Sequence, residues 1–205
     1  MARDTRSITK MSRREGYALH PKAHKYMAKR STMPGQHGRT GRRNVQSQYA
    51  LQLREKQKVK RLYGLLERQF SNLMSEANRK EGQSGAVLLK LLEQRADNAV
   101  YRAGFASSRR AARQLVTHGH FMLNSRRVDI PSIRLKPGDV LIVRPKSLTT
   151  EYFKNLDDVT GNPDVTVGWL KANRKKFEIT VTGTPSREEA EPDINEQLIV
   201  EYYSR

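Results

Sequence analysis

The residues best suited to bind a ligand are arginines, and one group of them lies at the start of a predicted helix. In the stretch "ASSRRAARQLVTHGH", Arg109, Arg110 and Arg113 fall in the first turn and a half of that helix. Their guanidinium groups and the free backbone amides of the helix start can bind phosphate together. A solvated basic face is the alternative, but acids are nearly absent between positions 99 and 128, so pairing within the chain does not account for these charges. We therefore predict that this helix start contacts nucleic acid.

A second group of polar residues surrounds the short turn "PGQHG" at residues 34–38. Pro34 restricts one backbone angle, while Gly35 and Gly38 allow a tight turn with exposed amides. Gln36 and His37 add hydrogen-bond donors, and three arginines follow at once: Arg39, Arg42 and Arg43. A plain surface turn is the alternative, but the arginines favour a loop that approaches an RNA backbone.

Further basic residues complete the predicted RNA-binding set, each as a phosphate clamp and none as a reactive group. They are Arg13 and Arg14 near the N-terminus, Arg54, Lys56 and Lys58 in a predicted helix, and Arg126 in the hairpin region. The aromatic residues on predicted apolar faces are expected to pack in the core and not to stack on bases: Tyr49, Tyr63, Phe70, Tyr101 and Phe121. The chain is thus expected to read RNA shape and phosphate.

The overall charge supports a polyanionic partner. The chain has 205 residues with 39 Lys plus Arg against 21 Asp plus Glu, a formal net charge of +18. Residues 1–60 carry +13 and residues 61–150 carry +9, whereas residues 151–205 carry −4. The acidic C-terminal segment would repel RNA, so a protein interface is predicted there, with Glu196, Tyr202 and Tyr203 as its residues; a solubilising edge is the alternative.

Several function classes are disfavoured by what the sequence lacks. There is no cysteine, which removes disulfides, thiolate chemistry and cysteine zinc sites. Two histidine pairs, His20 with His24 and His118 with His120, lack a third ligand, so no metal site or other cofactor is expected. No P-loop or convincing catalytic grouping is present, which predicts a protein that is not an enzyme and has no small-molecule substrate. No apolar run suits a membrane span or signal peptide, so a soluble intracellular protein is expected.

Hydrophobic periodicity predicts helices first and strands later. Residues 50–80 read as one long helix, residues 84–104 as a second that stops at Gly104, and residues 109–119 as a third. Short strands follow at 121–123, 128–130, 133–135 and 140–142. Beyond residue 150, "KFEITVTGT" alternates like a strand, "DVTVGWL" is its candidate partner, and "EQLIVEYY" is either a strand or a helical turn.

Several longer stretches of the sequence resemble a known protein family. The stretch from "LLEQRADNAVYRAG" to "LKPGDVLIV" resembles the small RNA-binding domain named after bacterial ribosomal protein S4. "PGQHG", "YALQLREKQKVKRLYGLLERQF" and "DINEQLIVEYYSR" resemble the ribosomal protein S4 family itself, in the right order and at the right spacing. Many relatives carry four zinc-binding cysteines in the N-terminal arm; Thr9 and Ser12 stand here where two of them would be, so zinc is not expected. The family's Asn-Gly hairpin turn appears as Asn124-Ser125.

The resemblance implies an α+β fold in four parts. A basic N-terminal arm (1–45) precedes a helical domain (46–92), which is completed by about residues 185–205. A small RNA-binding domain of two helices and short antiparallel strands (93–150) is inserted into this helical domain. Residues 151–184 form a β-rich connection of uncertain assignment. It also implies a structural protein of the small ribosomal subunit in the cytoplasm, with an organellar ribosome left open.

The function implied by the resemblance is binding of the five-prime domain of small-subunit ribosomal RNA early in assembly. The resemblance implies ribosomal proteins S5 and S3 as neighbours, and contact with messenger RNA near the channel by which it enters the ribosome. It also implies that the protein influences translational accuracy. The competing hypothesis is a free RNA chaperone or stalled-ribosome factor with the same small domain. A factor of that kind would not need the N-terminal 90 residues.

Overall fold

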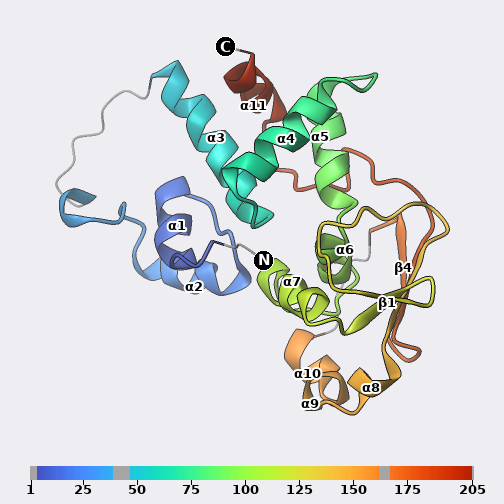
Figure 1. The fold of residues 1–205 in the computed structure, drawn as a ribbon. Coiled ribbons are helices and arrows are strands. Elements are labelled where there is room, and N and C mark those ends of the chain that lie inside the picture. The colour runs from blue at the N-terminus through green and yellow to red at the C-terminus, as the bar shows by residue number, and fades with distance from the viewer. Residues whose placement is uncertain (1–3, 39–46, 162–166, 205) are drawn as a thin grey trace. The chain divides into compact units, whose positions relative to one another are not determined.

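The structure is a computed structural model that describes residues 4–38, 47–161 and 167–204 (Figure 1). Two compact units divide the chain. The first comprises Met1–Leu88 and Asp193–Arg205, and the second, Leu89–Pro192, is inserted between these segments. Helices dominate the first unit and an antiparallel sheet the second. The predicted α+β class, with a helical domain completed by the C-terminal segment, is confirmed.

The first unit is built from helices α1 (Ile8–Glu15), α2 (Pro21–Lys29), α3 (Gln48–Leu62), α4 (Glu67–Ala77), α11 (Glu196–Tyr203) and the start of α5 (Ser84–Glu93). Helix α1 packs against α2 and α3, and α11 packs along α3. The core contains Val59, Phe70 and Met74, which are fully buried. The N-terminal arm has more local structure than its composition predicts, because Met11 and Ala23 supply a small buried apolar face for α1 and α2.

Two predicted helices are each divided in the structure. The predicted helix 50–80 is split into α3 and α4 because Gly64 has a left-handed backbone angle (φ 66°). The predicted helix 84–104 is split into α5 and α6 (Ala96–Arg102), because Arg95 has extended backbone angles and forms an isolated β-bridge with Arg134. That bridge is all that remains of the strand predicted at 133–135, whereas Gly104 stops α6 as predicted.

The second unit contains one antiparallel sheet, in the order β2-β1-β3-β5-β4. Its strands are β1 (Phe121–Leu123), β2 (Arg126–Val128), β3 (Val140–Val143), β4 (Leu170–Asn173) and β5 (Glu178–Val181). Inward-facing residues such as Phe121, Leu141 and Ile179 share one core with α6 and α7 (Arg109–Thr117). The strand predicted in "KFEITVTGT" is β5. Its partner β4 begins at the last residue of "DVTVGWL", and "EQLIVEYY" is a helix.

Residues 144–161 connect β3 to the remaining strands. They form three short helices, α8 (Pro145–Leu148), α9 (Glu151–Lys154) and α10 (Leu156–Thr160). Phe153 and Leu156 are buried in the core of the second unit. Strands β4 and β5 then join the same sheet, and β5 pairs with β3. This connection therefore belongs to the inserted unit.

The β1–β2 turn offers a test of local strain. Asn124 and Ser125 both have positive φ, 47° and 70°, as a two-residue hairpin turn requires. Serine pays a steric cost in this region that glycine does not. Ser125→Gly is therefore expected to raise the free energy of unfolding by about 0.5 to 1 kcal/mol, measured by urea denaturation. Ser107→Gly, at an exposed serine outside any helix or strand, is the control, and an S125G variant no more stable than wild type would contradict the prediction.

Candidate nucleic-acid interface

The arginines at the start of α7 are held by side chains of their own unit. Ser108 caps the helix by accepting a hydrogen bond from the Ala111 amide. Arg109 donates to Asn98 Oδ1 at 2.9 Å and to Glu191 Oε1 at 2.7 Å. Arg113 donates to Asp97 Oδ2 at 3.1 Å. Their guanidinium groups therefore have defined positions before any ligand binds.

These ion pairs overturn one expectation from the sequence. The acids that pair with the arginines lie just outside the acid-poor window, or far from it along the chain. Arg102 donates to both oxygens of the buried Glu93, and Arg95 and Arg113 share Asp97. The inference that pairing within the chain cannot account for these charges was wrong. Of the three predicted α7 residues, Arg110 is the one whose side chain is exposed.

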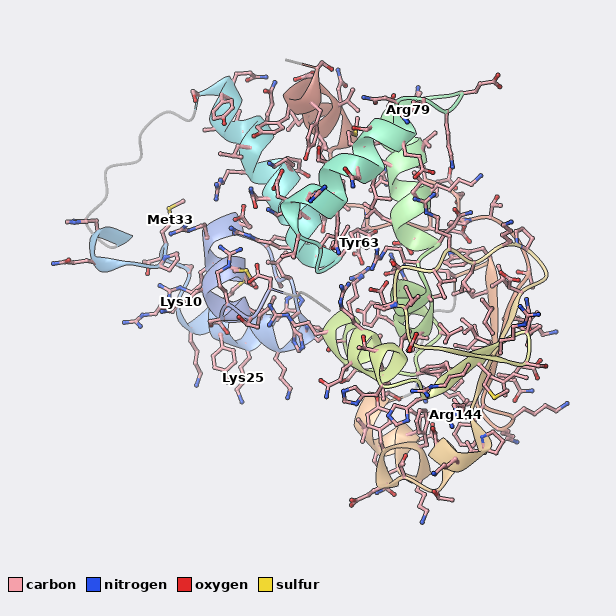
Figure 2. All side chains as sticks on the ribbon, viewed as in Figure 1. Lys10, Lys25, Met33, Tyr63, Arg79 and Arg144 are labelled. Carbon is pink, nitrogen blue, oxygen red and sulfur yellow. The ribbon has the colours of Figure 1, made fainter. Side chains whose placement is uncertain are left out.

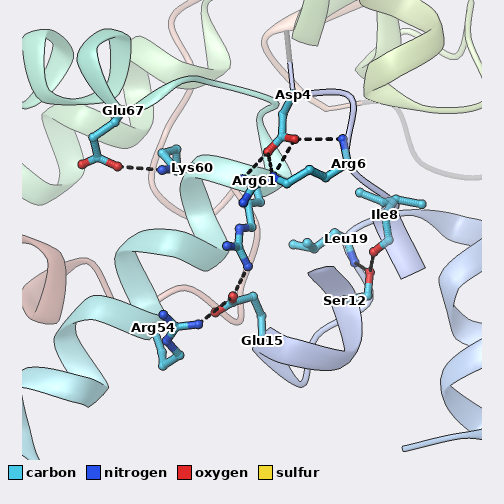
Figure 3. Close-up of polar contacts among 10 residues, drawn as sticks. All are labelled: Asp4, Arg6, Ile8, Ser12, Glu15, Leu19, Arg54, Lys60, Arg61 and Glu67. Carbon is cyan, nitrogen blue, oxygen red and sulfur yellow. Dashed lines mark hydrogen bonds and ion pairs between the residues drawn. The ribbon is translucent and has the colours of Figure 1, made fainter. Parts of the chain in front are cut away.

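Helix α3 carries a second set of partnered cations. Arg54 and Arg61 both donate to Oε1 of Glu15 on α1, and the side chain of Glu15 is fully buried (Figure 3). Burial raises the pKa of Glu15 above its ordinary value, although Arg54 and Arg61 oppose that change. Burial likewise lowers the pKa of Arg61. Arg54, predicted as a phosphate clamp, thus helps to fasten α1 to α3.

The lysines of α3 are engaged as well. Lys56 and Lys60, one turn apart, donate to the two oxygens of Glu67 at 2.6 Å each. Burial would raise the pKa of Glu67, but these hydrogen bonds outweigh it and lower that pKa to about 2. Lys56 is buried and its ammonium also lies 4.4 Å from the Tyr202 ring centroid, so the expectation that it clamps a phosphate is corrected to a structural role. Lys58 donates to the Asp193 carbonyl at 2.7 Å, which fastens the C-terminal segment.

The predicted arm residues divide into three groups. Arg13 donates to the carbonyls of Thr32 and Met33, so it holds the loop that precedes "PGQHG". Arg14, Gln36 and His37 are exposed, the last two in a 3-10 turn at Gln36–Gly38. Two further exposed cations of the arm, Lys10 and Lys25, are labelled in Figure 2. Arg39, Arg42 and Arg43 lie outside the described residues.

A basic cluster that the sequence only partly predicted surrounds the turn between α7 and β1. Arg127 on β2 is exposed and its guanidinium group lies against Gly119. Arg126, also exposed, pairs instead with Leu123 at the other end of β1. Arg144, labelled in Figure 2, follows β3 and donates to the Gly119 carbonyl at 3.1 Å. It was missed because it stands alone after the apolar strand "VLIV", and strand pairing alone brings it back to this turn.

The histidines beside this turn occupy different environments. His118 is exposed, whereas the Nδ1 atom of His120 lies 3.0 Å from the Ser147 hydroxyl. Burial lowers the pKa of His120, and the positive charges of His118 and Arg144 add to that effect. Among the described residues, no group of three or more His, Cys, Asp or Glu side chains could hold a metal ion.

The predicted protein interface on α11 is largely used inside its own unit. Tyr203 donates to Glu67 Oε1 at 3.1 Å and lies beside Phe70, and Tyr202 lies beside Tyr49. The Glu196 side chain packs against Gly85. The expectation of core packing is confirmed for Tyr63, Phe70 and Phe121, and Tyr101 is half-buried and packs against the core of the second unit. The expectation is wrong for Tyr49, which is 48% exposed.

Comparison with known proteins connects this geometry to a function. Residues 3–93 match the family described as "Ribosomal protein S4/S9 N-terminal domain", and residues 94–141 match the "S4 domain". The chain is 50% identical over 206 residues to "Small ribosomal subunit protein uS4" of Chloroflexus aurantiacus, and 50% identical over 211 residues to the protein of that name from Clostridioides difficile. It is 48% identical over 206 residues to the one from Chlorobium phaeovibrioides. Each comparison covers 100% of both chains. None of the helices described here is long and apolar enough to cross a membrane.

Proposed function

Because the chain belongs to the family of the small ribosomal subunit protein uS4, we propose that it is a primary binder of the five-prime domain of small-subunit ribosomal RNA and helps to nucleate subunit assembly. The family is one of structural constituents of the ribosome with an RNA-binding domain, and its members are not enzymes. The single observation that carries the finer proposal is that basic side chains are exposed on both units, Arg14 on the first and Arg126 and Arg127 on the second, in a chain with a net charge of +18.

The predicted RNA-binding residues act in two ways in this proposal. The exposed ones contact phosphates: Arg14, Gln36, His37, Arg110 and Arg126. The partnered ones position the contacting surface: Arg13, Arg54, Lys58, Arg109 and Arg113. This division follows from the hydrogen bonds, because the donors of the partnered cations that already bond a carbonyl or carboxylate of the chain are not available to a phosphate.

The proposal extends to neighbours in the ribosome. The exposed 3-10 turn of "PGQHG" supports contact with messenger RNA near the channel by which it enters, with an effect on accuracy. The exposed Tyr49 beside Tyr202 supports a protein interface at the α3–α11 surface, for which ribosomal protein S5 is the proposed partner and S3 a second neighbour. A free RNA chaperone is the weaker candidate, since the relatives align along the whole chain.

Binding in a salt series tests the proposal. The purified protein is mixed with the five-prime domain of small-subunit ribosomal RNA and, separately, with an unrelated structured RNA of equal length. We expect at least about 100-fold tighter binding to the ribosomal RNA, a difference that persists as salt rises, because a shaped site adds to counterion release. Equal affinities that fall together with salt would refute the proposal and favour the chaperone.

A further inference from the structure

Two arginines converge on one residue of the α7–β1 turn. Arg144 donates from its Nη1 atom to the Gly119 carbonyl at 3.1 Å. Arg127 lies against the Cα of the same residue: a Cβ at position 119 would stand 2.5 Å from Arg127 Nε and 2.8 Å from its Nη2 atom. Gly119 itself has φ of 70°. The absence of a side chain at position 119 is therefore what admits the Arg127 guanidinium.

Among the described residues, this pair differs from three arginines of α6 and α7 in having no bonded carboxylate. Arg102, Arg109 and Arg113 each bond a carboxylate. Within the part of the chain that the structure describes, neither Arg127 nor Arg144 forms an ion pair with a carboxylate. The depressed pKa of His120, caused by burial and then by His118 and Arg144, is a second sign that the local field is positive. Like charges held close together without compensation are repulsive, and a bound anion removes that cost.

We propose that the Gly119 turn is a phosphate clamp, in which Arg127 and Arg144 bind one backbone phosphate of the RNA between their guanidinium groups. The clamp rests on the proposed function, since its ligand is the ribosomal RNA. A phosphodiester suits the planar fork of each guanidinium group, which can donate two parallel hydrogen bonds. Arg126, the neighbour of Arg127 in β2, is also exposed but points to the opposite face of the sheet, so it is not part of the clamp.

Two variants test the clamp in the full chain. Arg127→Gln removes one guanidinium group from an exposed position. Gly119→Asn keeps every charge but places a Cβ where the Arg127 guanidinium lies, and asparagine tolerates positive φ better than most residues. The matched control is Lys171→Gln, which removes one positive charge from an exposed position on the edge strand β4. Thermal unfolding establishes that all three variants fold.

The readout is affinity for the five-prime-domain RNA over a salt series. We expect R127Q and G119N to bind about tenfold more weakly than wild type at about 0.1 M salt. R127Q should also lower the slope of log affinity against log salt by about 0.7 to 0.9. K171Q should match wild type. Because G119N leaves net charge unchanged, a loss of affinity in that variant separates clamp geometry from bulk attraction.

The outcomes distinguish the clamp from the proposed function. If wild type prefers the ribosomal RNA but R127Q and G119N bind as K171Q does, the clamp is refuted and the proposed function stands. If wild type shows no preference for the ribosomal RNA, the proposed function itself fails. A parallel titration with polyglutamate covers the alternative ligand: if R127Q weakens polyglutamate binding and leaves RNA binding unchanged, the turn binds an acidic protein and the RNA clamp is refuted.

Discussion

Replacement of Asp97 by asparagine is expected to lower the free energy of unfolding of the unit Leu89–Pro192 by about 3 to 5 kcal/mol. Asp97 is buried and accepts hydrogen bonds from Arg95 at 3.0 and 2.8 Å and from Arg113 at 3.1 Å. Asparagine preserves the shape but removes the negative charge between two guanidinium groups. A buried cation that loses its partner carries a desolvation cost that nothing offsets.

The single tryptophan makes this expectation measurable. Trp169 is 2% exposed and lies in the core of the same unit, so its fluorescence reports the unfolding of that unit in urea. Asp158→Asn, at an exposed position on α10, is the matched control and should leave the midpoint unchanged. A D97N variant whose midpoint coincides with that of D158N would show that the Arg95–Asp97–Arg113 cluster adds nothing to stability.

The helices and strands that depend on a few neighbouring residues could be predicted from the sequence, whereas features that depend on pairing between distant residues could not. The strands around Phe121 and Val140 and the helix that starts at Arg109 were predicted because alternation, capping and glycine stops act over a few residues. The break between α5 and α6 was not predicted, since it depends on pairing of Arg95 with Arg134, 39 positions away. The division between α3 and α4 was not predicted either, because the apolar spacing continues across Gly64 and does not show that its backbone turns left-handed.

The candidate site shows the same limit more sharply. Counting charges located the basic groups correctly but could not say which of them remain available. Arg109 pairs with Glu191, 82 residues later, and Arg61 pairs with Glu15, 46 residues earlier. A local window misses such partners, so availability follows from tertiary structure. Arg127 and Arg144 are the converse case, because folding brings together at Gly119 two cations that form no ion pair with any carboxylate of the described residues.

The second large effect is expected at Glu67, where one carboxylate joins two lysines of α3 to the C-terminal helix. Glu67→Gln is expected to lower the free energy of unfolding of the helical unit by about 2 kcal/mol. Lys56 and Lys60 have side chains that are 4% and 10% exposed, and they would lose their charged acceptor. This expected loss of about 2 kcal/mol is small for a charged hydrogen-bond network, because solvent screens the Glu67 side chain, which keeps 47% of its area exposed.

The pH dependence of stability identifies the charge as the cause. The pKa of Glu67 is lowered from 4.5 to about 2 in the folded chain, so its contribution is fully present above about pH 4.5 and is lost as pH falls toward 2. Helix content followed by circular dichroism in urea should show E67Q as less stable than wild type at pH 7, with the difference shrinking below pH 4.5. Trp169 fluorescence serves as the internal control, since it reports the other unit. Glu81→Gln, at an exposed position, should behave as wild type. A difference between E67Q and wild type that stays constant down to pH 2 would mean that the negative charge of Glu67 is not the cause of the stabilisation, and would contradict the prediction.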